Sequence, residues 1–200
     1  MAAYEKRGES DEWYTPRYIF DALGETFDLD VAAPVEGPRH VPTSRWFSSD
    51  ALERPWNGFI WMNPPFGHQA TKRNWLKKFF ENANGIALLP DRTSAPWWQE
   101  FAPMADAIQF VSPKVKFEMP EGAIPEVHEL AAKGLSPLEI TALTRFSISN
   151  VKRILEGESV IEAPGTGTTL LASGDRAAAA LHRAAILGVV FTPIRSAKAA

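Results

Sequence analysis

The tetrapeptide Asn63-Pro64-Pro65-Phe66 combines residue types that can hold and activate an amino group. An adenine N6 amine is a poor nucleophile because its lone pair is delocalised into the ring. The Asn side-chain oxygen and the carbonyl of the following Pro can accept both N–H groups, which draws the nitrogen toward a pyramidal geometry. The prolines fix φ and remove backbone donors, so these acceptors are held rigidly. Phe66 can stack on a base that has flipped out of its duplex, so the four residues suit methyl transfer to an exocyclic amine.

The tetrapeptide directly follows the apolar run from Gly58 to Met62, which predicts a buried strand. Ligands of open α/β sheets bind at the carboxyl ends of strands, so the position agrees with the chemistry. The same residues are also an ordinary turn signal, with Phe66 returning to the core. Both interpretations remain open from the tetrapeptide alone.

Strand and helix signals alternate along most of the chain and predict an α/β fold with a mainly parallel sheet. The expected strands are 27–33, 58–62, 86–90, 107–112, 115–118 and 168–173. The expected helices are 16–24, with Thr15 as N-cap and Pro16 at the first helical position, 71–84, 94–104, with Ser94 as cap, and 175–187. Residues 124–156 carry no strand signal and predict three short helices, at 124–133, 136–143 and 147–155. The pattern therefore indicates a small helical unit inserted between two sheet segments.

The composition narrows the classes of function. The chain has 200 residues, a net charge of −3, no Cys and four His without metal-ligand spacing. Disulfides, thiolate metal sites and Cys nucleophiles are excluded. No apolar run approaches membrane-spanning length and the first residues are polar, so we expect a soluble, cytoplasmic protein. The negative net charge means that any contact with DNA must come from local basic patches.

A second predicted strand end offers candidate donor-binding residues. Asp30 could accept from a donor's amino group or ribose hydroxyls, and Ala32 and Ala33 would let the backbone approach a ligand. Thr15 and Pro16, at a helix start, could present N–H groups to the donor's carboxylate. Asp50 could accept from the donor's adenine amine. Each assignment has an alternative. Asp30 could be a strand-end turn residue, Thr15 and Pro16 could form a plain helix cap, and Asp50 could be an exposed loop carboxylate.

The order of these motifs resembles that of the phage-type DNA N6-adenine methyltransferases, which are Dam-like enzymes. The pieces are 11–16, 27–33, 50–52, Trp56-x-Gly58 and 63–66, followed by 88–93, 116–117 and 169–174. The resemblance implies a Rossmann-like S-adenosylmethionine-dependent methyltransferase fold, S-adenosylmethionine as cofactor, double-stranded DNA as partner and a bacterial host cell carrying a phage or prophage. It places Trp13, Thr15, Pro16, Asp30, Ala32, Ala33 and Asp50 in donor-binding positions, and Asn63, Pro64, Pro65 and Phe66 in the catalytic loop. Phe66 stands where Tyr is common, and the interruption between 117 and 169 is the larger departure.

The interruption resembles the helix-turn-helix of resolvase and invertase tails. We expect a flexible arm at 1–10, a methyltransferase core at 11–121 and 163–200, and an inserted unit at 122–162. Leu135, Ile140, Leu143, Val151, Ile154 and Leu155 would form the small core of this unit. Arg145, Ser147, Ser149, Asn150, Lys152 and Arg153 would face the major groove or the phosphates and supply local positive charge. The alternative is a helical cap whose polar face is only solvated.

The helix that carries Lys72, Arg73, Lys77 and Lys78 offers a second, weaker hypothesis for DNA contact. A charged, solvated helix face is the commoner explanation of such a run.

The function predicted from the whole chain is site-specific methyl transfer to adenine N6 in DNA, without a metal. The absence of Cys agrees with this, because methylation of a ring carbon commonly needs a thiol nucleophile. Two alternatives remain. The acceptor could be RNA or a protein glutamine amide, or the chain could be a non-enzymatic DNA-binding regulator with a relic methyltransferase core.

Overall fold

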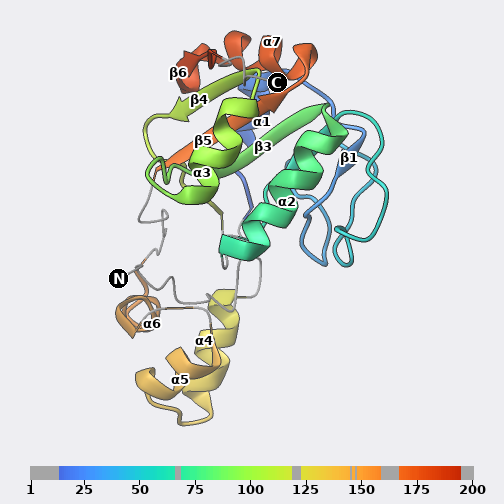
Figure 1. Cartoon of the computed structure of the whole chain (residues 1–200). Helices are drawn as coiled ribbons and strands as arrows, with labels where there is room; N and C mark the ends of the chain where they lie inside the picture. Colours follow the sequence, from blue (N-terminus) through green and yellow to red (C-terminus); the bar gives the residue numbers. More distant parts are fainter. Residues whose placement is uncertain are drawn as a thin grey trace.

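The structure, a computed structural model, describes residues 14–65, 69–118, 123–144, 146, 148–158 and 167–194. Within these ranges six strands form one sheet in the order β1-β2-β3-β5-β4-β6 (Figure 1). The strands are β1 (Leu29–Asp30), β2 (Ile60–Met62), β3 (Gly85–Pro90), β4 (Ala107–Val111), β5 (Thr168–Ser173) and β6 (Gly188–Phe191). The α-helices are α1 (Arg17–Leu23), α2 (Gln69–Asn82), α3 (Pro96–Phe101), α4 (Ala123–Ala132), α5 (Pro137–Leu143), α6 (Ile148–Leu155) and α7 (Asp175–Arg183), with 3-10 turns η1 (Ala102–Met104) and η2 (Ala185–Leu187).

The sheet is mixed, and its two halves differ. β1, β2 and β3 are parallel neighbours, whereas β5 is antiparallel to both β3 and β4, and β6 is antiparallel to β4. Three of the five pairings are therefore antiparallel, and the expectation of a mainly parallel sheet is wrong for this half. Thr168, the first residue of β5, pairs with Val111, the last residue of β4. The chain thus leaves β4 and enters β5 at the same end of the sheet, so β5 must run opposite to β4.

Helices cover both faces of the sheet (Figure 1). One hydrophobic cluster joins α1 and α7 to the sheet and includes Phe20, Trp61 and Leu181. The other joins α2 and α3 to the opposite face and includes Phe79 and Trp97. Successive strand residues point to opposite faces, so β2, β3 and β5 each contribute to both clusters. The result is a three-layer α/β core, consistent with a methyltransferase-like fold.

Several local signals have the outcome predicted, and others do not. Gly24, at φ 62°, ends α1, and the bounds of β5 agree with the expected strand. Neither Thr15 nor Ser94 caps a helix, because α1 and α3 begin after Pro16 and Ala95 without a side-chain cap bond. Residues 115–118 form no strand, apart from an isolated bridge between Glu118 and Tyr14.

Helices α4, α5 and α6 pack around a hydrophobic cluster of their own, made of Val127, Ile140, Phe146, Val151 and Ile154. The start of α5 is a capping box, in which the Ser136 hydroxyl accepts from the Glu139 N–H and Glu139 accepts from the Ser136 N–H.

The prediction of which residues form the core of this unit is wrong in part. Leu143 and Leu155 are 61% and 36% exposed, and Phe146 and Val127 take their places. Three packed helices are observed, and the helix-turn-helix assignment stays a prediction.

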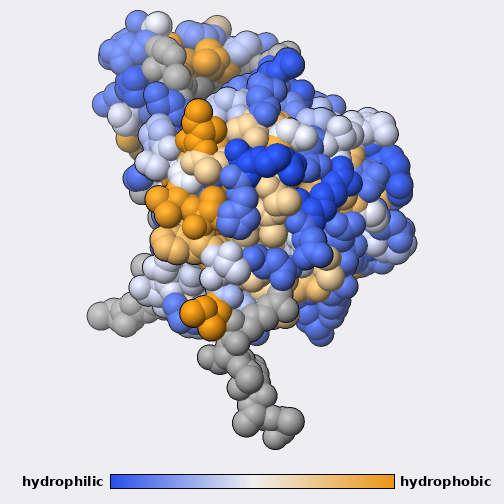
Figure 2. All heavy atoms as spheres, turned by 90° about the horizontal axis from the view of Figure 1, so that it is seen from above, coloured by the Kyte–Doolittle hydropathy of each residue, from blue (hydrophilic) through white to orange (hydrophobic). Residues whose placement is uncertain are grey.

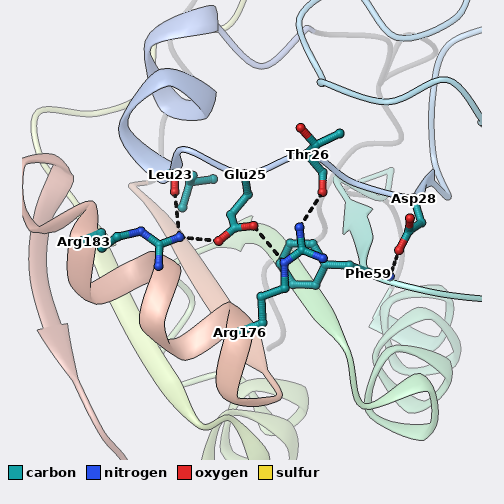
Figure 3. A network of polar contacts seen from close by, with 7 residues as sticks. All are labelled: Leu23, Glu25, Thr26, Asp28, Phe59, Arg176 and Arg183. Carbon is teal, nitrogen blue, oxygen red and sulfur yellow. Dashed lines mark hydrogen bonds and ion pairs between the residues drawn. The ribbon is translucent and has the colours of Figure 1, made fainter.

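Two arginines of α7 hold the turn that follows α1 (Figure 3). Arg176 donates from Nε to Glu25 at 2.8 Å and from Nη2 to the Thr26 carbonyl at 3.0 Å, and its guanidinium lies 4.1 Å from the Phe59 ring centroid. Arg183 pairs with the other oxygen of Glu25. The network fixes the end of α1 against the sheet, and so helps to place the residues at the start of the same helix.

Candidate active site

Two segments far apart in sequence meet at the carboxyl ends of β1 and β2. These strands are parallel neighbours, with Asp30 in register with Trp61. Asp30 and Asn63 therefore lie at the same edge of the sheet, the one formed by the carboxyl ends of β1 and β2. Thr15, which precedes α1, is 5% exposed. Asn63 donates from Nδ2 to Thr15 Oγ1 at 3.3 Å. The structure therefore brings a predicted donor-binding residue into contact with the predicted catalytic loop.

The contact with Thr15 orients the Asn63 amide. An amide accepts only through its oxygen, so with Nδ2 donating to Thr15 the Oδ1 atom stays available to accept from an amine. Asn63 is half-buried, Pro64 is buried and Pro65 is exposed, whereas Phe66 lies outside the described residues. A rigid acceptor at a partly open edge can receive an N–H group from a base.

Asp30 is a buried carboxyl group at this edge, with 3% of its surface exposed. Burial raises the pKa of Asp30 to about 7, and a hydrogen bond from the Ala32 N–H at 3.0 Å acts in the opposite direction. Among the described residues this is the one hydrogen bond that reaches the carboxyl group, so its other acceptor positions are available. A buried acceptor with spare capacity suits a ligand that donates N–H or O–H groups.

The neighbouring predicted donor-binding residues are placed around Asp30 and Thr15. Ala32 is half-buried, Ala33 is buried and donates its N–H to the Phe47 carbonyl, and Pro16 is buried. Trp13 lies outside the described residues.

Asp50 stands apart from this group as an exposed loop residue with φ at 55°. In the described part of the chain no hydrogen bond joins it to Thr15, Asp30 or Asn63. The loop that follows is nevertheless fixed. Trp56 Nε1 donates to the Ala51 carbonyl at 2.8 Å, and Lys78 Nζ donates to the carbonyls of Ala51 and Leu52 at 3.1 and 2.6 Å.

The basic residues of α2 do not form a DNA-facing surface. Lys72 is 1% exposed, with Nζ 5.7 Å from the Trp97 ring centroid, and Arg73 pairs with Glu100 at 2.8 Å. Lys78 binds loop carbonyls, and burial lowers its pKa. Lys77 alone of the four is highly exposed, at 3.9 Å from Glu81. Both interpretations of this run, a DNA-contact surface and a solvated helix face, are wrong for Lys72 and Lys78. Lys72 holds α2 against α3, and Lys78 holds α2 against the loop at 50–56.

The predicted DNA-facing residues of α6 separate into different environments. Ser149 and Lys152 are exposed, but Asn150 is buried, with 4% of its surface exposed. Arg153 donates from Nε to Glu158 at 2.7 Å. Arg145 and Ser147 lie outside the described residues. Residues 123–158 contain five acidic and four basic residues, so the expected local positive charge is offset within the unit.

Asp28 anchors the strand that carries the loop, a role that its position in the sequence did not indicate. Its Oδ2 accepts from the Phe59 N–H at 2.7 Å. A Cβ at Gly58 would lie 2.4 Å from the same oxygen, so only Gly fits there. The Gly58 signal, directly before the apolar run, could have pointed to this close approach.

Within the described ranges, no cluster of three or more His, Asp or Glu side chains could hold a metal ion. No helix among the same residues is long and apolar enough to cross a membrane.

A family model described as DNA N-6-adenine-methyltransferase (Dam) matches residues 3–141, more than half of the chain. The match covers the edge that holds Thr15, Asp30 and Asn63 and extends into α5. No curated protein and no solved structure matches the chain.

Proposed function

The chain belongs to the DNA N-6-adenine-methyltransferase (Dam) family, and from this premise we propose that it transfers a methyl group from S-adenosylmethionine to adenine N6 at specific sites in double-stranded DNA. The observation that carries the proposal is the hydrogen bond between Asn63 and Thr15, next to the buried carboxyl group of Asp30. This contact supports the proposal because it brings the proposed acceptor loop and the proposed donor-binding motif together.

The residues at the edge of the sheet suit the proposed methyl donor. S-adenosylmethionine supplies an electrophilic methyl group on a sulfonium. Asp30 would accept from its amino group or ribose hydroxyls, and the backbone at Ala32 and Ala33 would allow a close approach. Thr15 and Pro16 would lie near the donor, at the start of α1, and Trp13 would complete this side. Asp50 would accept from the adenine amine of the donor, from a loop held by Trp56 and Lys78.

The acceptor loop would hold the target amine. Asn63 Oδ1 and the Pro64 carbonyl would each accept one N–H of N6, which concentrates the lone pair on the nitrogen. Pro65 would stiffen the loop, and Phe66 would stack on the flipped base. Thr15 would keep the Asn63 amide in the orientation that leaves Oδ1 toward the amine.

The helical unit would supply contacts with DNA in this proposal, as a helix-turn-helix with α6 in or near the major groove. Ser149 and Lys152 are the exposed residues of α6 that support this role. Arg145 and Ser147 would add contacts, whereas Asn150 and Arg153 would have to leave their present environments to reach DNA. The setting would be the cytoplasm of a bacterial host that carries the gene on a phage or prophage.

The experiment is transfer of radiolabelled methyl from S-adenosylmethionine to unmethylated duplex DNA, with wild type, Asn63→Ala and Asn74→Ala side by side. Asn74 is an exposed residue of α2 and serves as a matched control. We expect N6-methyladenine with wild type and Asn74→Ala, and a loss of about a thousandfold with Asn63→Ala, the scale of removing one preorganised catalytic contact. Calorimetry should show equal donor affinity in all three.

Other outcomes would favour the rival functions. Label on RNA or on protein, with none on duplex DNA, would change the acceptor. DNA binding without any measurable affinity for the donor would indicate a regulator with a relic core. Equal loss of transfer and of donor binding in Asn63→Ala would make the loop structural.

A further inference from the structure

The two outer strands of the sheet, β1 and β6, differ in whether another segment pairs with their outer side. At the β1 edge, residues 45–47 run alongside the strand: the Asp30 N–H donates to the Arg45 carbonyl at 3.0 Å and the Phe47 N–H to the Asp30 carbonyl at 2.9 Å. β6 pairs with β4 on one side, and no other described strand pairs with it on the other. Among the described residues, β1 therefore has its outer side paired and β6 does not.

The register of β6 identifies which backbone groups face outward. The Ser112 N–H donates to the Leu187 carbonyl at 2.8 Å, and these residues are partners just beyond the Val111–Gly188 pair. Hydrogen-bonded and non-hydrogen-bonded pairs alternate along an antiparallel ladder. Val189 and Phe191 therefore bond to β4, and the N–H and C=O of Val190 point away from the sheet. Within the described ranges these outward groups of Val190 have no hydrogen bond.

Apolar side chains surround this edge. Ile186 is 87% exposed, Val189 62%, Phe191 54% and Ile194 94%, and residues 186–194 contain no charged residue. Phe191 is the outer end of a row of aromatic rings. Its ring centroid lies 5.9 Å from that of Phe110, and the Phe110 centroid lies 6.2 Å from that of Trp98. Figure 2 shows apolar atoms gathered on the side of the molecule where β6 lies in Figure 1. Proteins usually protect an edge strand with charge, Pro or a cover, and here the first protecting residue is Pro193, beyond the strand.

We propose that β6 is a homodimer interface, in which β6 of a second copy pairs antiparallel with it about a two-fold axis through Val190. In this register the outward N–H and C=O of Val190 bond to those of Val190 in the second copy. Val189 then lies opposite Phe191 of the second copy on one face, and Phe191 opposite Val189. Aromatic and β-branched residues form favourable cross-strand pairs of this kind. The two sheets would join into one continuous sheet of twelve strands.

A second copy fits this edge for two reasons. The register is self-complementary, so one two-fold operation satisfies both edges with the same contacts. Residues 186–194 carry no charge that would repel the same segment of a second copy or select a charged partner. The four exposed side chains present on the order of 500 Å² of surface, so with the paired backbone they approach the roughly 800 Å² per partner of a standard interface.

The experiment measures the mass of the full chain by sedimentation over a range of concentrations, for wild type, Val189→Lys and Val35→Lys. Val35 is a 74% exposed valine in the loop after β1, so it controls for the same substitution on another surface. We expect a dimer for wild type and Val35→Lys. Val189→Lys should weaken the dimer roughly a hundredfold or more, because the ammonium would be buried opposite Phe191 without a partner.

Hydrogen exchange supplies an independent measurement of the register. The Val190 amide should be protected in the dimer and lose protection on dilution, while the Val189 and Phe191 amides, bonded to β4, stay protected. Circular dichroism and thermal unfolding would confirm that Val189→Lys is folded. A wild type that is monomeric at all concentrations overturns the proposal. A Val189→Lys dimer as tight as wild type, or a Val190 amide indifferent to dilution, also overturns it.

Discussion

The edge of the sheet that holds Asn63 and the helical unit at 123–158 were both predicted to touch DNA, but the structure treats their polar residues differently. At the sheet edge, Thr15, Asp30 and Asn63 converge from three segments, and each is bonded to or buried against the core. In α6 the predicted residues diverge into exposed, buried and ion-paired environments.

The difference follows from what supports each region. The sheet edge rests on two large hydrophobic clusters and on parallel neighbours that put strand ends side by side. The helical unit rests on five buried side chains, and a face of α6 must supply part of them. Asn150 is buried in α6 together with Val151 and Ile154, which belong to this small core. Five predictions test this contrast, from the largest expected effect to the smallest.

Phe146→Ala should destabilise the helical unit by about 3–5 kcal/mol, the usual cost of emptying a buried aromatic site. Since its cluster is separate from those of the sheet, donor affinity should not change. Hydrogen exchange by mass spectrometry should show lost protection in α4–α6 alone. Phe101→Ala, in the α2–α3 cluster, is the control and should produce the reverse pattern. Loss of protection throughout the chain in both variants would mean that the two regions fold as one unit.

Asp30→Asn should weaken donor binding by about 2 kcal/mol at pH 8, where wild-type Asp30 is ionised and accepts as a carboxylate. Because the folded pKa of Asp30 is about 7, wild-type affinity should fall as the pH decreases through 7 and then level off about thirtyfold lower, which corresponds to the same 2 kcal/mol. Calorimetry between pH 5.5 and pH 8.5 measures this. Asp30→Asn should remove the pH dependence, and a variant that keeps it would exclude Asp30 as its source.

The same group has an opposite effect on the stability of the ligand-free fold. The raised pKa means that the folded protein favours neutral Asp30, whereas the unfolded chain ionises near pH 4. The contribution of Asp30 to the free energy of unfolding is therefore fully present below pH 4 and is lost as the pH rises to about 7. In Asp30→Asn this part of the pH dependence should be absent.

Thr15→Val should lower kcat about five- to tenfold, which corresponds to about 1 kcal/mol for one lost hydrogen bond. The donor KM should change little, because the hydroxyl orients Asn63. Thr15→Ser keeps the hydroxyl and should restore kcat. A rise in donor KM at constant kcat would instead assign Thr15 to the donor, as the sequence had suggested.

Lys152→Ala should reduce the dependence of DNA affinity on salt by about one unit of slope if α6 contacts phosphates. Lys133→Ala, an exposed lysine that follows α4, serves as the matched control and should leave the slope unchanged. Equal slopes for wild type and both variants would restrict DNA contact to the sheet core and favour a helical unit whose polar face is only solvated.

The predictability of individual elements follows how local their determinants are. The bounds of β5 were predicted because a run of small and apolar residues ends at Gly174, which has φ at 91° and can be occupied with little strain only by Gly. Residues 115–118 have the alternation of a strand, and Val115 and Phe117 are indeed buried, but the ladder that the structure describes here is a single bridge between Glu118 and Tyr14. The sequence did not predict β6, because Gly188–Phe191 has no alternation of apolar and polar residues. These four residues form a strand because β4 has an edge with which they can pair.

The sequence by itself determined the α/β character, the family and the position of the Asn63–Phe66 tetrapeptide after a strand, because these depend on residue types and short spacings. Only the tertiary structure decided that Thr15 contacts Asn63 rather than capping α1, that Lys72 and Lys78 face inward, and that β5 runs against its neighbours. These outcomes depend on contacts between segments that are far apart in the chain. A buried amine or hydroxyl takes whichever partner the packed core brings within reach, and no local pattern records that partner.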